Sequence, residues 1–265
     1  MPVRAEALAL LYANPDSIIP LSKKDSVEAA RNVEKARKAY DEARREFLKH
    51  HLGRFYGVAI FGSKELGPET EEYQFAVNLA KSLVETRDVD IVSGGGPGIM
   101  AAAHEGAQLA IQEASEQGRK LRAKTHGLRI DLPFEEPING NINILTTHTD
   151  FSTRLQEFLD ITQAAYNAPG GIGTLLEQMI VIQSIQVNHL RDYIVIAHPF
   201  WEPVVDSWNN ELYHGRVSQG RPPLIRQQDL NIVQFSNSIP DIVNTISAGY
   251  DIWRGTIRDR VRIIP

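Results

Sequence analysis

Three glycine-rich segments, each placed directly after a short apolar run, constrain the fold of this chain most strongly. They read Phe61-Gly62-Ser63-Lys64, Ser93-Gly94-Gly95-Gly96-Pro97-Gly98-Ile99-Met100 and Pro169-Gly170-Gly171-Ile172-Gly173-Thr174. The runs before them, at 56–61, 90–93 and 164–167, have the length and composition of buried strands, and helical patterns follow at 69–86, 99–117 and 174–187. Strands that alternate with helices in this way predict a parallel sheet with helices on both faces.

The remaining sequence from Arg54 onward continues the same alternation. Further strands are predicted at 127–132, 142–147 and 193–197, and further helices at 152–162 and 240–248. The last of these helices carries its proline at the first position, where a missing N–H costs little. We therefore predict one α/β domain over residues 54–265, a Rossmann-like, doubly wound parallel sheet.

The first 53 residues do not show the alternation of strands and helices and are predicted to form a helical N-terminal extension. The segment from Asp25 to His51 contains neither Gly nor Pro, and its apolar positions recur at steps of three and four from Val27 to Phe47. We expect an amphipathic helix that packs on the main domain or on a partner subunit. Acidic residues alternate with its basic ones, so a solvated, salt-bridged face is favoured over nucleic-acid binding.

Composition narrows the class of protein further. The chain has 265 residues, a net charge of −5 and no Cys, which excludes disulfides, a thiol nucleophile and thiolate metal sites. No apolar run approaches the roughly 18 residues of a membrane span. The short stretch from Ala7 to Leu11 follows Glu6 and is not expected to be a signal peptide. These features predict a cytoplasmic protein that binds neither nucleic acid nor membrane.

The glycine-rich segments themselves predict a phosphate-binding site. In sheets of this kind, ligands bind beyond the carboxyl ends of the strands, where a glycine loop and a helix N-terminus face an anion. The chain has no G-x-x-x-x-G-K-[ST], which excludes a P-loop. Residues 96–101 match the dinucleotide pattern G-x-G-x-x-A, but the basic segment 118–122 stands where an acidic ribose ligand is expected. NAD is therefore weakly supported, and NADP remains conceivable. The motifs H-E-x-x-H and G-x-S-x-G are also absent.

Two of these segments together resemble the LOG ("lonely guy") family, whose members are often mislabelled lysine decarboxylases. Residues 169–177 match the signature P-G-G-x-G-T-x-x-E, and residues 94–100 match G-G-G-x-x-G-x-M in a version one residue shorter. Residues 61–63 match the family's first loop, 127–135 its middle strand followed by "LPFE", and 153–158 its arginine-bearing helix. The resemblance covers roughly residues 56–199. The chain departs from the family at Leu155, at Leu176 and at 101–104, where Ala-Ala-Ala-His replaces E-A-A-N.

The resemblance implies a nucleoside 5′-monophosphate phosphoribohydrolase, which releases a free base and ribose 5-phosphate without metal or cofactor. Arg154 and Glu177 would be the catalytic pair, and a purine nucleotide, AMP or GMP, the substrate. It also implies a homodimer or larger homo-oligomer with sites near the subunit interface. The residues expected to bind the substrate and its phosphate are Gly62, Ser63, Gly94, Gly95, Gly96, Met100, Gly170, Gly171, Gly173 and Thr174.

Each of these residues also has a purely structural interpretation. Thr174 and Glu177 form the pattern of a T-x-x-E capping box at a helix N-terminus. Arg154 would be a surface residue in the first turn of a helix, where the helix dipole disfavours a cation. The default interpretations of Lys64 and His104 are a solvated lysine and a histidine on a helix surface.

Two rival functions remain to be weighed against the hydrolase. One is a non-catalytic nucleotide or cofactor carrier of the same fold, against which the retention of both Arg154 and Glu177 argues. The other is a pyridoxal-phosphate-dependent lysine decarboxylase, which needs a Schiff-base lysine beside the phosphate site. The glycine loops supply only Lys64, with no supporting motif, so this second rival is rejected.

Overall fold

The computed structural model describes residues 55–131 and 137–263, with side chains up to Thr256, and nine single positions between 27 and 42. The chain divides into two compact units, Met1–His50 and His51–Pro265. In the first unit the nine described positions are helical and exposed, and Glu34 pairs with Lys38 at 3.8 Å. Most of the predicted apolar stripe and the whole "LPFE" segment, 132–135, lie outside the described residues.

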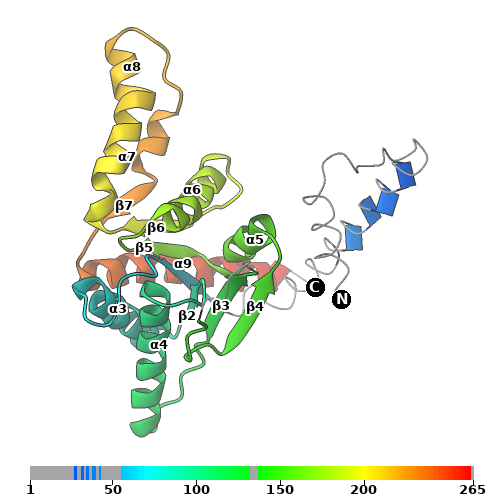
Figure 1. The fold of residues 1–265 in the computed structure, drawn as a ribbon, viewed down its shortest axis with the longest axis vertical. Coiled ribbons are helices and arrows are strands. Elements are labelled where there is room, and N and C mark those ends of the chain that lie inside the picture. The colour runs from blue at the N-terminus through cyan, green and yellow to red at the C-terminus, as the bar shows by residue number, and fades with distance from the viewer. Residues whose placement is uncertain are drawn as a thin grey trace, which may run out of the picture. The chain divides into compact units, whose positions relative to one another are not determined.

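The second unit is an α/β domain built on a seven-stranded parallel sheet, as predicted (Figure 1). Its elements in chain order are β1 (Gly57–Phe61), α3 (Glu71–Arg87), β2 (Asp90–Ser93), α4 (Ile99–Glu116), β3 (Thr125–Ile130), β4 (Ile144–His148), α5 (Phe151–Ile161), β5 (Ala164–Asn167), α6 (Ile172–Gln186), β6 (Ile194–Ala197), η2 (Pro199–Trp201), α7 (Glu202–Asn209), η3 (Asn210–His214), α8 (Gly215–Ser218), η4 (Gln227–Asn231), β7 (Val233–Phe235) and α9 (Ile239–Ile263).

The strand order is β4-β3-β2-β1-β5-β6-β7, so the direction of strand addition reverses between β1 and β5. These two strands are in parallel register, with Ile60 opposite Tyr166 and Phe61 opposite Asn167. A reversal of this kind leaves a crevice beyond the carboxyl ends of the two strands, because the following loops turn to opposite faces of the sheet. This crevice is where the candidate site lies.

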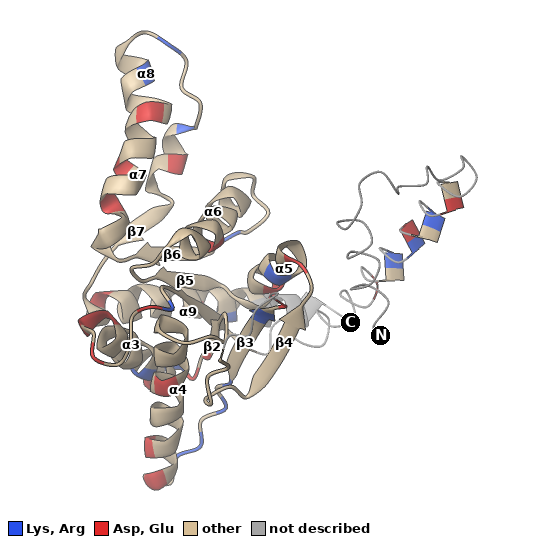
Figure 2. Cartoon of the chain, viewed as in Figure 1, with Lys and Arg blue, Asp and Glu red and all other residues tan. Residues whose placement is uncertain are grey.

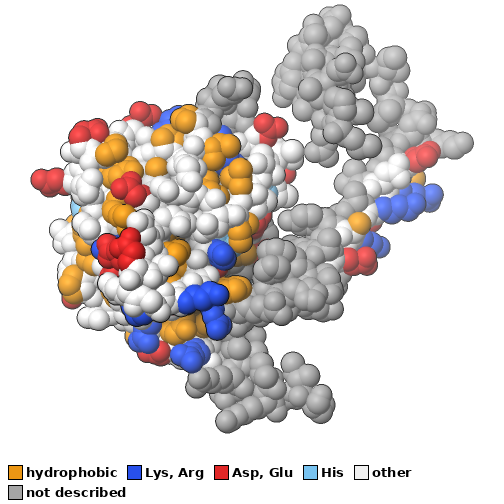
Figure 3. Space-filling model, turned by 90° about the horizontal axis from the view of Figure 1, so that it is seen from below, with side chains coloured by type: hydrophobic (Ala, Val, Ile, Leu, Met, Phe, Trp, Pro, Cys, Tyr) orange, Lys and Arg blue, Asp and Glu red, His pale blue; other side chains and the backbone are white. Residues whose placement is uncertain are grey.

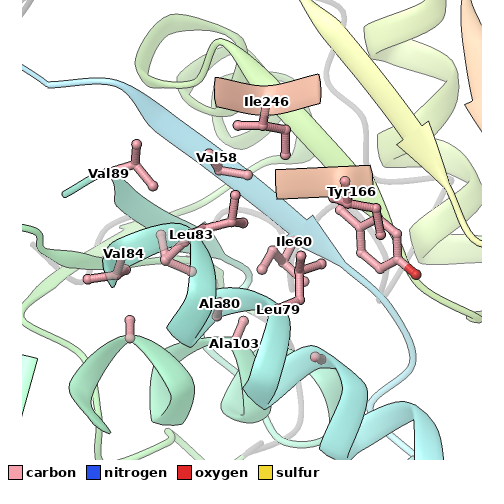
Figure 4. Packing of buried hydrophobic residues seen from close by; sticks show 14 of the residues in the cluster. Val58, Ile60, Leu79, Ala80, Leu83, Val84, Val89, Ala103, Tyr166 and Ile246 are labelled. Carbon is pink, nitrogen blue, oxygen red and sulfur yellow. The ribbon is translucent and has the colours of Figure 1, made fainter. Parts of the chain in front are cut away.

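Helices cover both faces of the sheet and bury two apolar clusters. On one face α3, α4 and α9 pack on β1, β2 and β5, and Figure 4 shows Leu79 and Leu83 of α3 beside Val58 and Ile60 of β1. On the other face α5 and α6 enclose a second cluster around Phe61. Each fully buried aliphatic side chain contributes about 1.5–3 kcal/mol relative to exposure. The two clusters thereby hold the strand ends in place.

The structure differs from the prediction in the C-terminal third. An arm of α7, η3 and α8 extends away from the sheet beside α6 (Figure 1), and β7 adds an edge strand, neither of which was predicted. Helix α9 runs to Ile263, although Gly249 suggested an end at residue 248. A Cβ at Gly249 would lie 2.3 Å from Cδ1 of Ile194, so this glycine allows close packing within a continuing helix.

Charged side chains of both signs are distributed over the domain. Figure 2 shows acidic residues on the arm and at the start of α3, where Glu71 and Glu72 occupy the first turn, an electrostatically favourable place for them. On the face seen in Figure 3, hydrophobic side chains are scattered among polar ones. No helix among the described residues is long and apolar enough to cross a membrane.

Candidate active site

A cleft of about 380 Å³ opens at the crevice between β1 and β5. Its walls come from the loops after β1, β2 and β5, from the end of β3, from α5 and from the beginnings of α4 and α6. The lining residues are Gly62, Ser63, Lys64, Glu65, Gly94, Gly96, Met100, Arg129, Ile130, Arg154, Gly171, Gly173, Thr174 and Glu177. Ten of the twelve predicted site residues therefore line one cleft, and the other two, Gly95 and Gly170, belong to the same loops.

The three glycine-rich loops are joined through the backbone of Ser63. Its N–H donates to the carbonyl oxygen of Pro169 at 3.1 Å, which joins the first loop to the third. Its carbonyl oxygen accepts from the N–H of Ile99 at 3.0 Å, which joins the first loop to the second. These two hydrogen bonds hold the three loops, which are far apart in the sequence, side by side at the cleft.

Close packing explains why several of these positions are glycine. A Cβ at Gly94 would lie 2.7 Å from Nη2 of Arg154, and one at Gly170 would lie 2.2 Å from Oγ1 of Thr174. Gly95 has a φ of +74°, which favours glycine. A Cβ at Gly171 or Gly173 would meet no described atom within 4 Å, so this part of the chain leaves the backbone there accessible to a ligand.

Two helix N-termini meet at the cleft. Helix α4 has Gly98 as its N-cap and α6 has Gly171, and among the described residues no side chain caps either helix, although the first N–H of α4, that of Ile99, donates to Ser63. The first N–H groups of a helix lack intrahelical acceptors, and the helix dipole adds partial positive charge there. The geometry therefore suits an anionic group such as a phosphate.

Arg154 and Glu177 form an ion pair at the cleft, with Nη2 of Arg154 2.9 Å from Oε1 of Glu177. Both residues are only 8% exposed. Nε of Arg154 donates to the carbonyl oxygen of Leu128 at 2.7 Å, and the guanidinium lies over the ring of Phe158, 5.1 Å from its centroid. These contacts fix the guanidinium, and through it the position of the carboxylate.

Burial raises the pKa of Glu177 above its ordinary value, and the charge and hydrogen bond of Arg154 oppose this rise. The carboxylate is thus held in a poorly solvated position, where it interacts strongly with any positive charge that develops nearby. A carboxylate so placed can stabilise a cationic transition state or bind the attacking water.

A family model described as "Possible lysine decarboxylase" matches residues 100–235, just over half of the chain. The chain belongs to the LOG family. It is 28% identical over 149 residues to the "Probable cytokinin riboside 5'-monophosphate phosphoribohydrolase LOG6" of Arabidopsis thaliana, an alignment that spans 56% of this chain and 69% of that protein.

Solved structures show the same fold at low sequence identity. The molybdenum cofactor binding protein of Rippkaea orientalis matches with a TM-score of 0.51 and 16% identity, over 74% of this chain and 98% of that one. The molybdenum cofactor carrier protein MCP of Chlamydomonas reinhardtii matches with a TM-score of 0.51 and 14% identity, over 75% and 99%. The LOG-family domain of this chain therefore shares a Rossmann-like fold with these proteins.

The capping-box interpretation of the LOG signature is wrong. Helix α6 begins at Ile172 with Gly171 as its N-cap, so Thr174 lies inside the first turn and Glu177 lies almost a turn further on. Too far along the helix to bond the N-cap backbone, Glu177 pairs with Arg154 instead. The surface interpretation of Arg154 is also wrong, because its side chain is buried against Phe158 and Leu128.

The prediction for His104 fails as well, whereas Lys64 is exposed as expected. His104 is fully buried, because α4 packs against both α3 and the sheet and His104 lies on the buried face of the helix with Ala103 and Ala107. Four residues that line the cleft were not predicted as site residues, namely Lys64, Glu65, Arg129 and Ile130. Their position directly after β1 or at the carboxyl end of β3 was the available signal.

No cluster of three His, Cys, Asp or Glu side chains able to hold a metal ion occurs among the residues that the structure describes. Three basic side chains line the cleft. Lys64 comes from the loop after β1, Arg129 from β3 and Arg154 from α5. The cleft therefore presents two arginines, one lysine and two carboxylates to a ligand.

Proposed function

We propose that this LOG-family protein hydrolyses the N-glycosidic bond of a purine nucleoside 5′-monophosphate, AMP or GMP, to a free base and ribose 5-phosphate. The observation that carries the proposal is the buried Arg154–Glu177 pair, which lies in the same cleft as two uncapped helix N-termini. The family relationship and the name of the Arabidopsis relative support the same reaction class.

The proposed roles follow from the chemistry of the bond. The 5′-phosphate would bind the N–H groups at the start of α6, between Gly171 and Thr174. As the bond from C1′ to the base nitrogen breaks, positive charge builds on the ribose. Glu177 would stabilise that charge and orient the water whose oxygen bonds to C1′, while a proton from this water ends on the base. Arg154 would hold hydroxyl or phosphate oxygens of the substrate.

A panel of nucleoside 5′-monophosphates and their nucleosides tests this proposal. We expect AMP or GMP to yield free base and ribose 5-phosphate in equal amounts, and to bind far more tightly than adenosine or guanosine because the phosphate supplies the charge. Tight nucleotide binding without base release would favour the non-catalytic carrier. Equal affinity for nucleotide and nucleoside would contradict the phosphate assignment.

A further inference from the structure

The loop that follows β2 forms a wall of the cleft, yet its glycines have no side chains with which to hold it in place. Gly94 and Gly96 line the cleft, and a Cβ at Gly94 would lie 2.7 Å from Nη2 of Arg154. The position of this loop and that of the arginine are therefore linked. Whatever fixes the loop also fixes the space around Arg154.

Asn139, from the segment between β3 and β4, binds two consecutive carbonyl groups of this loop. Its backbone N–H donates to the carbonyl oxygen of Gly95 at 3.3 Å, and its side-chain Nδ2 donates to that of Gly96 at 3.1 Å. Its Oδ1 accepts from the N–H of Asn141 at 3.3 Å. These contacts fix the orientation of the amide, since its nitrogen must face Gly96 and its oxygen must face donors.

His104 holds the amide of Asn139 from the other side. Nδ1 of His104 lies 3.2 Å from Oδ1 of Asn139, so this ring nitrogen carries the proton. In the neutral ring Nε2 is then an acceptor, and it lies 3.1 Å from Oγ of Ser93. The carbonyl oxygen of His126, also 3.1 Å from Nε2, receives no proton from the ring in this state. Burial keeps the ring neutral, because it lowers the pKa of His104 to about 4.

The hydrogen bonds close into a ring that begins and ends at neighbouring residues of the loop. The N–H of Gly95 donates to Oγ of Ser93 at 3.2 Å, and this oxygen lies 3.1 Å from Nε2 of His104. Nε2 of His104 and the carbonyl oxygen of Met100, at 3.3 Å, are the two acceptors within reach of the single Ser93 hydroxyl proton. His104 then donates to Asn139, and Asn139 donates to Gly96. An N–H and a carbonyl group of the loop are thus held by one network of buried or half-buried side chains.

We propose that Asn139, held by His104, is a positioning residue that fixes the loop 94–98 as the cleft wall beside Arg154. The expected effect of Asn139 on turnover rests on the proposed function, whereas the effect of Asn139 on the position of the loop does not. Neither side chain lines the cleft, so Asn139 acts through the loop and not by contact with the substrate.

The substitution Asn139→Asp tests this proposal with little change in shape. A carboxylate still accepts from His104 and from the Asn141 N–H, but it cannot donate to the carbonyl oxygen of Gly96. The matched control is Asn143→Asp, on the same segment, because Oδ1 of Asn143 accepts from Thr125 and Gln108 and not from the glycine loop, and a carboxylate keeps these bonds. If Asn139→Asp does not fold, Asn139→Ser removes the same donor by shortening the side chain.

Three quantities are measured: the rate of amide hydrogen exchange at Gly95, the Kd for AMP and kcat for AMP. We expect Asn139→Asp to speed exchange at Gly95, to raise the Kd for AMP and to lower kcat, with the exchange rate and the Kd each changed by about tenfold or more. Asn143→Asp should leave all three near the wild-type values. A purely stabilising role would lower the melting temperature without these changes at temperatures well below it.

Several results would overturn the proposal. Exchange and Kd within twofold of wild type in Asn139→Asp would do so, as would faster exchange without any change in binding or turnover. Altered binding with unchanged exchange would also contradict it, because the effect would then not pass through the loop. If the wild-type protein neither binds nor hydrolyses AMP, the proposed function fails, and the exchange measurement still decides whether Asn139 fixes the loop.

Discussion

A buried ion pair is costly, because each partner loses its hydration and regains only part of that energy from the other. Arg154 and Glu177 nevertheless lie buried together, and the backbone carbonyl of Leu128 and the ring of Phe158 add favourable contacts only to the arginine. Two apolar side chains of similar volume would serve folding at least as well. The position of the pair in a cleft therefore indicates a role in ligand chemistry.

The titration of Glu177 provides a first test at the scale of a single residue. Burial raises its pKa above the ordinary value of 4.5, and Arg154 lowers it. Because the proposed reaction needs the ionised carboxylate, turnover at saturating AMP should fall as the pH drops through this pKa. Carbon-13 NMR of the Glu177 carboxyl, assigned with Glu177→Gln, should show a midpoint above 4.5 in the free protein.

The variant Arg154→Met separates the effect of burial on the pKa of Glu177 from the effect of the arginine. Removal of the guanidinium leaves the burial and deletes the opposing charge, so the midpoint should move further upward. A wild-type midpoint at or below 4.5, or a downward move in Arg154→Met, would contradict this account of the carboxylate.

His104 gives a second residue-scale prediction, this one for stability against pH. Its pKa is lowered from 6.5 to about 4 in the folded protein, so the unfolded chain binds more protons between these values. The free energy of unfolding should therefore fall as the pH drops from 6.5 towards 4, by up to about 3 kcal/mol from this residue. Urea unfolding at several pH values should show a shallower pH dependence in His104→Asn, and equal slopes would contradict the prediction.

At the residue scale, the family motifs predicted which residues lie in the site. The contacts that those residues make depend on packing and were predicted less well. Arg154 and Glu177 were predicted from the family signature, and the cleft brings them together. The sequence did not predict that Glu177 pairs with Arg154, because Thr174 and Glu177 also have the spacing of a helix capping box. Only the start of α6 at Ile172 decides between the two interpretations.

The packing of α3 against α4 provides a prediction at the scale of elements. Gly106 lies within α4, and a Cβ there would lie 2.0 Å from the carbonyl oxygen of Val77. Gly106→Ala should therefore destabilise the domain by about 1–3 kcal/mol, although alanine is the better helix former. The control is Gly255→Ala in α9, where nothing lies within 4 Å and a gain of up to about 1 kcal/mol is expected. Urea unfolding measures both, and equal effects would refute the assigned contact.

The elements themselves were predicted best where apolar runs and glycines marked both ends. Strand β5 has the predicted bounds, and α4 and α5 begin within one residue of theirs. The arm of α7, η3 and α8 was missed, because each of these elements is short and the π-helical turn of η3 interrupts the regular period of the α-helix. Helix α9 was predicted too short, since glycine in a helix normally signals its end but here allows close contact with Ile194.

Assembly is the prediction that belongs to the whole molecule. Helix α6 carries exposed apolar side chains at helical spacing, at Ile172, Leu176 and Met179, and the exposed Val187 follows its last residue; Ile172 is 82% exposed. Contiguous exposed apolar surface commonly marks an interface. We expect a homodimer or larger homo-oligomer by light scattering at micromolar concentration, and a lower mass for Val187→Glu. A monomeric wild-type mass would contradict the prediction.

The central claim is that Glu177 takes part in cleavage of a glycosidic bond, and Glu177→Gln tests it most directly. The amide keeps the size of the side chain but removes the charge that would stabilise the ribose cation. Release of base from AMP or GMP by the folded variant should fall by about 10²–10³-fold, while nucleotide affinity stays close to wild type. The melting temperature should fall, because the buried Arg154 loses its counter-charge, so turnover is compared well below that temperature. The control Glu113→Gln makes the same chemical change at the pair with Lys81, far from the lining residues of the cleft, and should leave turnover unchanged. Near-normal base release by Glu177→Gln would contradict the account.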